Sequence, residues 1–154
     1  MKAPTLGYED DARISKSEMA LVQLRGSIAL FLRQEFLCAL TLAGAAEAIL
    51  AGLLAAKQER SVVEESADEA LRVAKVGELV GLDGASRKDM FKAWNAGRNL
   101  AKHHGEGDAD AVAINLFDES YWMIRRALSN AERLALAVDS AHDFEHWVVA
   151  NINM

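Results

Sequence analysis

The chain has few of the residues and motifs that interrupt helices or mark common catalytic sites. A single proline, Pro4, leaves every residue from Thr5 onward free of the strongest helix breaker. One cysteine, Cys38, excludes an intramolecular disulfide and fits a reducing compartment, and its apolar neighbours predict a small buried side chain. The sequence contains no Gly-rich phosphate loop, no Cys-x-x-Cys pair and no Gly-x-Ser-x-Gly motif. Nothing in it therefore indicates an NTPase, a zinc finger or a serine hydrolase.

The composition is that of a helical protein. Hydrophobic residues make up 51% of the 154 residues but aromatic residues only 6%, so alanine, leucine and valine, two of them strong helix formers, provide most of the apolar content. This length favours one domain with its own core. The net charge of −6 argues against the broad positive field that drives nonspecific nucleic-acid binding. No basic-then-apolar leader opens the chain, so we expect a cytoplasmic protein without a secretory signal.

One segment is long and apolar enough to raise the question of a membrane. Between Phe36 and Ala56 the only charged residue is Glu47, and the segment nearly has the length of a bilayer span. An acid at the midpoint makes insertion costly. We therefore expect a central helix, buried nearly all round within a bundle, and no membrane association.

The pattern predicts an all-α, up-and-down bundle of five to six helices. Residues 1–16 read as a mobile N-terminal tail and residues 17–154 as a single helical-bundle domain. We expect helices over 17–33, 35–60, 62–80 and 86–103 or 104, another after Asp108 or Asp110, and a short last one from Asp139 or Ser140.

Two of these helices carry a clear apolar seam. In the fifth, apolar residues recur at steps of three and four, which is typical of packing in a bundle: Ile114, Phe117, Tyr121, Ile124, Leu128, Ala131, Ala135 and Val138. In the last, Phe144, Trp147 and Val148 share one side.

The candidate site lies near the end of the predicted fourth helix. On a helical wheel, one polar strip there consists of Lys92, Asn95, Asn99 and Lys102. Arg98 lies beside this strip and His103 lies at its edge. The opposite, core-facing side would hold Met90, Ala93, Gly97, Leu100 and Ala101. His104 would project toward that apolar side, so His103 is favoured as the partner of Arg98. A guanidinium binds phosphate and an imidazole transfers protons, which together suggest chemistry on a phosphodiester. A surface helix with satisfied polar side chains is the alternative.

Two segments carry a family resemblance. Residues 95–103, Asn-Ala-Gly-Arg-Asn-Leu-Ala-Lys-His, resemble the signature of HEPN domains, an Arg-x(4–6)-His motif with a polar residue after the arginine. Residues 40–50, with an acid amid small residues, are similar to the second helix of bacterial HEPN-like proteins. The resemblance covers roughly residues 18–140.

The resemblance implies a helical bundle that pairs as a homodimer and brings two motifs into one cleft. Catalytic members are metal-independent endoribonucleases, needing no cofactor, of toxin–antitoxin or defence systems. Carried onto this chain, His103 would move the proton, Arg98 would hold the phosphate and Asn99 would orient one of them. Lys102 would add positive charge, and Glu47 would pair with Arg98 or fix the tautomer of His103.

Other HEPN-like proteins are non-catalytic, which gives a second reading of the same motif. The chain would then be a dimeric protein- or nucleotide-binding module, whose acidic surface serves an antitoxin or another protein partner. In the first reading the partner is an RNA substrate.

A third reading starts from the last predicted helix. His142 and His146 match the letters H-x-x-E-H of inverted zinc peptidases, with Asp139 one turn earlier. Two histidines and a carboxylate could bind zinc and support a metal-dependent hydrolase. The pair lies opposite Phe144 and Trp147, so a solvated helix face is the favoured interpretation.

Overall fold

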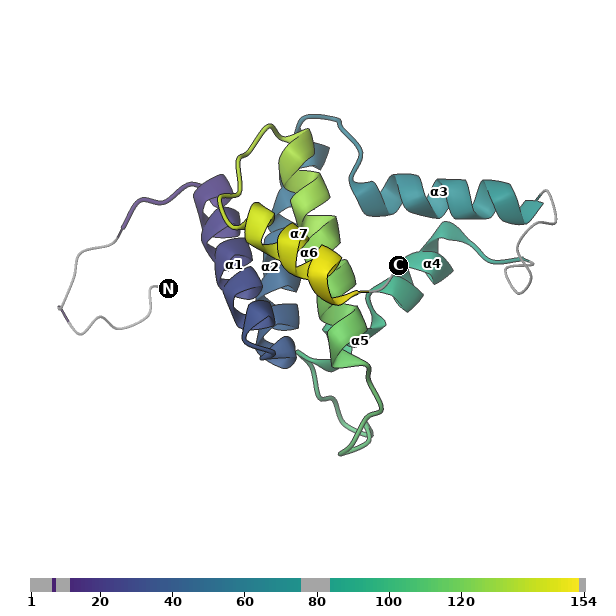
Figure 1. Cartoon of the computed structure of the whole chain (residues 1–154). Helices are drawn as coiled ribbons and strands as arrows, with labels where there is room; N and C mark the ends of the chain where they lie inside the picture. Colours follow the sequence, from purple (N-terminus) through teal and green to yellow (C-terminus); the bar gives the residue numbers. More distant parts are fainter. Residues whose placement is uncertain (1–6, 8–11, 76–83, 153–154) are drawn as a thin grey trace.

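The computed structural model describes residue 7 and residues 12–75 and 84–152, and within them the chain is all-helical. The helices of these ranges are α1 (Lys16–Leu32), α2 (Phe36–Ala56), α3 (Val62–Lys75), α4 (Arg87–Trp94), α5 (Ala96–Leu100), α6 (Leu116–Arg133) and α7 (Ala141–Asn151) (Figure 1). The expected all-helical bundle is confirmed, but these ranges hold seven helices rather than five to six, because the predicted fourth helix is divided into α4 and α5. Most of the predicted tail, the end of the predicted third helix and the turn after it lie outside the described residues.

The centre of the bundle consists of α1, α2 and α6, with α2 packed against both neighbours. Helix α1 runs antiparallel to α2, whereas α6 runs parallel to α2 (Figure 1). At the starts of the two helices the rings of Phe36 and Phe117 meet at 5.4 Å. Near their ends Arg133 donates to the backbone carbonyl of Arg60 at 3.0 Å. The predicted up-and-down order is therefore wrong, because α3–α5 carry the chain back before α6 begins.

Aromatic rings fill one end of the core. The ring of Phe31 lies 5.1–5.6 Å from four others, which belong to α2, α6 and α7: Phe36, Phe117, Phe144 and Trp147. Offset and edge contacts of this kind add to the stabilisation from burial alone. Phe144 and Val148 are buried and Trp147 packs on the same cluster, as the predicted seam of α7 requires.

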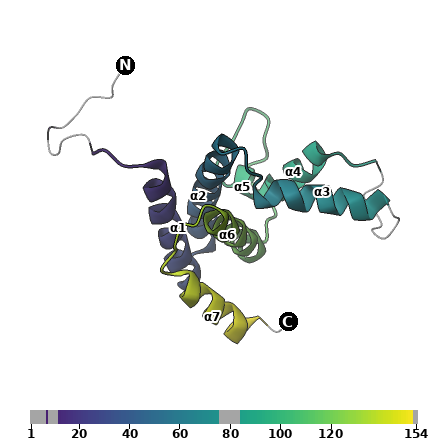
Figure 2. The same cartoon turned by 90° about the horizontal axis from the view of Figure 1, so that it is seen from above.

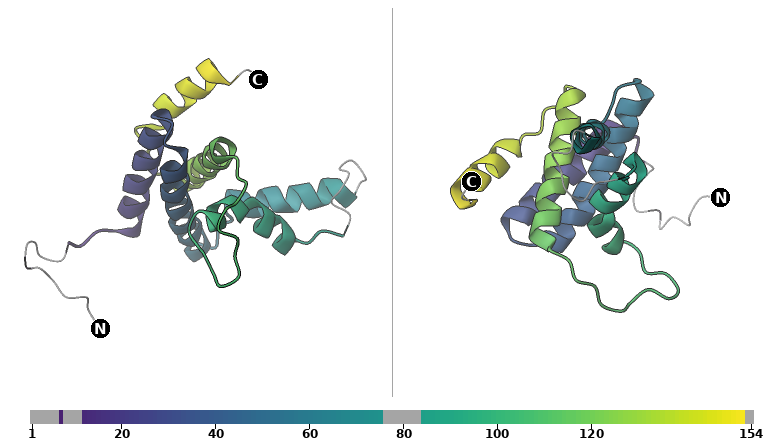
Figure 3. Two further views of the ribbon diagram at one scale, coloured as in Figure 1. Left: turned by 90° about the horizontal axis from the view of Figure 1, so that it is seen from below. Right: turned by 90° about the vertical axis from the view of Figure 1, so that its right-hand side faces the viewer.

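The helices α3 and α4 form an arm that projects from this core (Figures 2 and 3). Asp68 on α3 accepts hydrogen bonds from Arg60 and from Arg87 on α4, which ties the two helices together. The hydrogen bond from Arg87 is the main reason why the pKa of Asp68 is lowered. At the base of the arm, the side-chain oxygen of buried Asn130 accepts from the backbone N–H of Val62 at 2.9 Å.

Several predicted boundaries need correction. The fourth helix does not continue to His103: it stops at Trp94, and after Asn95 the five-residue α5 ends at Leu100. The helix begins just after Ser86, close to the predicted start, and Ser86 and Asp89 form a capping box there. The fifth helix starts at Leu116, where Asn115 accepts from the backbone of Asp118, rather than just after Asp108 or Asp110.

Two predicted burial patterns are also wrong. Ala135 and Val138 lie beyond the end of α6; Ala135 is exposed with a φ of +54°, whereas Val138 still packs on the core. Cys38 is exposed rather than buried. It lies on the side of α2 that faces away from α1 and α6, because α2 is buried on one side and not all round.

Within the described ranges, α2 is also the helix whose length and apolar composition would suffice to cross a membrane. The core helix of a bundle has the same composition, and α2 holds buried Glu47 together with core residues such as Leu40 and Leu50.

The Asn130 side chain should stabilise the arm measurably. We expect Asn130→Ala to lower the free energy of unfolding by about 1–3 kcal/mol, because the N–H of Val62 loses its acceptor inside the protein. Chemical denaturation measures the change. Ser129→Ala is the matched control on the same helix and should change stability by less than about 0.5 kcal/mol. Equal effects of the two substitutions would contradict this role.

Candidate functional site

The candidate site centres on a buried carboxylate. Glu47 on α2 is 3% exposed, and two arginine side chains reach it from other helices. Arg126 on α6 donates to Glu47 Oε1 at 3.1 Å, and Arg98 on α5 lies 3.5 Å from Glu47 Oε2. A buried charge is costly without a partner. The structure thus pairs Glu47 with Arg98. This is one of the two roles that the resemblance implied for Glu47, the other being to fix the tautomer of His103.

Two glycines allow α5 to approach α2 and α6 so closely. A Cβ atom on Gly44 of α2 would lie 2.6 Å from Arg98 Cδ, so the Arg98 stem occupies the space that a side chain would fill. A Cβ atom on Gly97 of α5 would lie 2.2 Å from a carboxylate oxygen of Glu119 on α6. The short helix therefore sits against both long helices, and Arg98 lies directly over α2.

Arg126 belongs to the site although the sequence analysis did not select it. It also donates to the backbone carbonyl of Trp94 and to Asn95 Oδ1, each at 3.1 Å. Asn95 in turn donates to the carbonyl of Phe91 at 2.8 Å. Arg126 thus connects the break between α4 and α5 to Glu47 through hydrogen bonds on both sides. Nothing in the local sequence distinguishes Arg126 from its neighbour Arg125 on the amphipathic helix α6.

The charges in this cluster do not balance. Two guanidinium groups face one carboxylate, which leaves one net positive charge around Glu47. The Nε atoms of Arg98 and Arg126 are buried, and within the described part of the chain neither has a hydrogen-bond acceptor. The Arg98 side chain is 18% exposed, so this cluster reaches the surface at one edge.

The remaining motif residues lie apart from the cluster. Asn99, Lys102, His103 and His104 are exposed, with both histidines beyond the end of α5. In the described part of the chain, no hydrogen bond links the side chain of Arg98 to that of either histidine. Of the predicted core side, Met90 and Gly97 are buried and Ala101 packs on the core. Ala93 and Leu100 are exposed instead, and Arg98 turns inward. The cause is the break at Asn95, which changes the direction of the chain halfway along the predicted helix.

The second histidine pair stands on the opposite side of α7 from its buried face. His142 and His146 are exposed, with ring centroids 6.4 Å apart and planes inclined by 10°. Asp139 lies in the preceding loop, also exposed. In the ranges that the structure describes, no group of three or more potential metal ligands is assembled.

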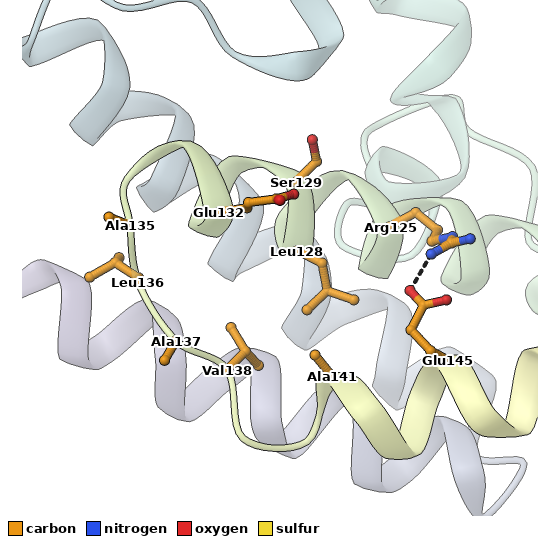
Figure 4. A pocket seen from close by; sticks show the side chains of 10 residues that line it. All are labelled: Arg125, Leu128, Ser129, Glu132, Ala135, Leu136, Ala137, Val138, Ala141 and Glu145. Carbon is orange, nitrogen blue, oxygen red and sulfur yellow. Dashed lines mark hydrogen bonds and ion pairs between the residues drawn. The ribbon is translucent and has the colours of Figure 1, made fainter.

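Two cavities open on the surface of α6. One, of about 540 Å³, lies between the C-terminal half of α6 and α7, with apolar walls that include Leu128, Leu136 and Val138 (Figure 4). The ion pair of Arg125 and Glu145 borders it. The other, of about 430 Å³, lies between α3, α4 and α6 and is lined in part by Arg126. The second cavity therefore adjoins the Glu47 cluster.

Comparison with known proteins adds no relative: no family model, no curated protein and no solved structure matches this chain.

Removing the charge of Glu47 should destabilise the bundle. We expect Glu47→Gln to lower the free energy of unfolding by about 3 kcal/mol, because two partly buried guanidinium groups would lose their counter-charge. Thermal and chemical denaturation measure this. Glu59→Gln, a substitution at an exposed carboxylate just after α2, should have an effect below about 0.5 kcal/mol. A fully stable Glu47→Gln variant would show that the cluster does not support the fold.

Proposed function

We propose that the chain is a HEPN-like, homodimeric interaction module in which the Arg-x(4)-His motif serves the fold rather than catalysis. The observation that carries this proposal is the commitment of Arg98 to buried Glu47, while His103 lies on an exposed turn. The motif residues that would have to act together are thus placed in different surroundings.

The chemistry of phosphate binding supports this assignment. A guanidinium that holds a phosphate offers it two parallel N–H groups. Arg98 directs Nη1 at Glu47, and its Nε is buried, so a phosphate would have to compete with a carboxylate already in place. A catalytic imidazole is usually oriented by a hydrogen bond on its second nitrogen. His103 has no such partner among the described residues.

The homodimer in this proposal is formed through the outer arc of α2. We use this name for the side of α2 that faces away from α1 and α6, and each of its residues is exposed or half-buried: Leu37, Cys38, Thr41, Ala45, Ala48, Gly52 and Ala55. None of them is charged, and Leu37 is 49% exposed. In a two-fold dimer each patch meets a copy of itself. An uncharged arc avoids the self-repulsion that other surfaces of a protein with a net charge of −6 would suffer.

The cytoplasm is the compartment we propose, because the single cysteine is exposed and would remain reduced there. The acidic surface favours a protein partner with basic residues, such as an antitoxin or another member of the same system, over a general nucleic-acid target.

The outer arc gives a direct test of the dimer. We expect the wild-type protein to have the mass of two chains in light scattering after size exclusion. Ala48→Glu should convert it to a monomer, because a carboxylate would be buried opposite its own copy. Ala150→Glu, at an exposed position of α7, is the control and should leave the mass unchanged.

A monomeric wild-type protein at about 100 μM, roughly a hundred times the micromolar Kd of a weak specific association, would contradict the dimer. Equal dissociation by both substitutions would show that the added charge, rather than the outer arc, is responsible.

A second candidate function is a metal-independent endoribonuclease, and the charge imbalance around Glu47 favours it. The extra guanidinium provides local positive charge in an acidic protein, and Lys102, His103 and His104 are exposed just beyond Arg98. In this candidate, His103 takes the proton of the ribose 2′-hydroxyl or returns one to the leaving oxygen. Arg98 stabilises the charge that develops on the phosphate, and Asn99 orients the reacting groups.

Paired measurements of RNA cleavage and stability separate the two candidates. If the motif serves the fold, Arg98→Ala lowers the free energy of unfolding by about 1–3 kcal/mol. The wild type then does not cleave RNA, and His103→Ala changes neither the stability nor this result. If the protein is a ribonuclease, RNA is cleaved in the presence of a chelator, and His103→Ala abolishes cleavage without loss of stability.

His146→Ala, a change at an exposed histidine on α7, controls for a general effect of losing an imidazole and should behave as the wild type in both assays. Cleavage that survives in His103→Ala would indicate a contaminating nuclease and would leave the ribonuclease candidate without support.

A further inference from the structure

The cavity between α3, α4 and α6 has walls of an unusual composition. Two of the three tryptophans in the chain line it, Trp94 from α4 and Trp122 from α6. Trp122 is 62% exposed, although the centroids of its ring and of the Tyr121 ring are 5.0 Å apart in a T-shaped arrangement. An indole is a large apolar surface, so leaving one this exposed on a helix has a cost unless something covers it.

Two carboxylates line the same cavity from the first turn of α6. Asp118 accepts a hydrogen bond from the side chain of Asn115 at 2.6 Å, which satisfies one of its oxygens. Glu119 is half-buried against Gly97, and no hydrogen bond or ion pair reaches its carboxylate from the described part of the chain. Acids in this turn interact well with the helix dipole, but the dipole does not supply the partner that a half-buried carboxylate requires.

The arginine at the edge of the cavity is not that partner. The terminal nitrogens of Arg126 donate to Glu47, to Asn95 and to the carbonyl of Trp94. Taken together, Glu47, Asp118 and Glu119 carry three negative charges, and the guanidinium groups of Arg98 and Arg126 carry two positive ones. These five side chains therefore sum to one net negative charge, and the charged residues that line the cavity itself, Asp118, Glu119 and Arg126, give the same sum.

We propose that this cavity binds an organic ammonium group, with Trp94 and Trp122 as its aromatic walls and Glu119 as its counter-charge. The faces of indole rings attract cations, most strongly where water is partly excluded. A half-buried carboxylate adds direct Coulomb attraction in a medium of lower dielectric constant than water. A volume of about 430 Å³ falls within the range of small-molecule pockets and accommodates a quaternary ammonium group with a short substituent.

The lining also discriminates against other ligands. A phosphate would meet two carboxylates, and a divalent metal would find two indoles where it needs oxygen ligands. A methylated ammonium has low hydration and apolar methyl groups, which match the indole walls. Such a group can belong to a free small molecule or to the modified lysine side chain of a partner protein.

The test compares two molecules of one shape and different charge. We expect choline to bind the full-length protein in calorimetric titration. Its neutral isostere has a quaternary carbon in place of the nitrogen and should bind about 2- to 30-fold more weakly. This factor is the affinity that a cation–π interaction contributes. A capped trimethyllysine amide, titrated in parallel, distinguishes the sources. Stronger binding of choline indicates a free ligand, and stronger binding of the amide indicates a partner side chain.

The variants locate the site. Trp122→Leu keeps an apolar side chain at an exposed position and should weaken choline binding by a similar factor, and Glu119→Gln should weaken it several-fold. Glu132→Gln, at an exposed carboxylate near the other end of α6, is the matched control and should bind as the wild type. Equal affinity for choline and its isostere, no binding of either cation, or unchanged binding in Trp122→Leu would overturn the proposal. These outcomes are independent of the dimer and of RNA cleavage.

Discussion

The buried carboxylate of Glu47 is the constraint on which the centre of this fold depends. A charge in a packed helical core is tolerated only with partners. Here the partners come from two segments far along the chain, Arg98 on α5 and Arg126 on α6. Satisfying Glu47 therefore fixes where the short helix α5 lies and how the break after α4 is attached. The ion pairs of Glu47 therefore fix the position of α5 against α2 and α6, which apolar packing alone would not do.

Small residues make this arrangement possible. Gly44 gives the Arg98 stem room to cross α2, and Gly97 lets Glu119 approach the backbone of α5. Because α2 and α6 are parallel, the crossover of α3–α5 must return the chain along the bundle, and α5 lies at the end of that return. The same crossover forms the arm and, with α6, the cavity that holds the two indoles. The site and the cavity thus arise from one topological feature.

The geometry also changes how the motif is understood. Arginine and histidine at a spacing of five residues suggest a catalytic pair when they are placed on one continuous helix. A break at Asn95 and an end at Leu100 place them in separate surroundings instead, with one tied to Glu47 and the other in solvent. Arg98 contributes to folding in any case.

The sequence by itself determined the all-helical class, the apolar α2 with its single acid, the seam of α7 and the start of α4 next to Ser86. These features depend on local spacing and on residue type, which a chain carries with it. Tertiary structure alone decided that α6 runs parallel to α2, that Arg126 joins Glu47, and that Arg98 turns inward. Each of those outcomes depends on contacts between segments far apart in sequence, such as Glu47 with Arg98, 51 residues apart, and Glu47 with Arg126, 79 residues apart. Local pattern carries no information on such pairings, because the desolvation of a charge is settled only when the whole bundle packs.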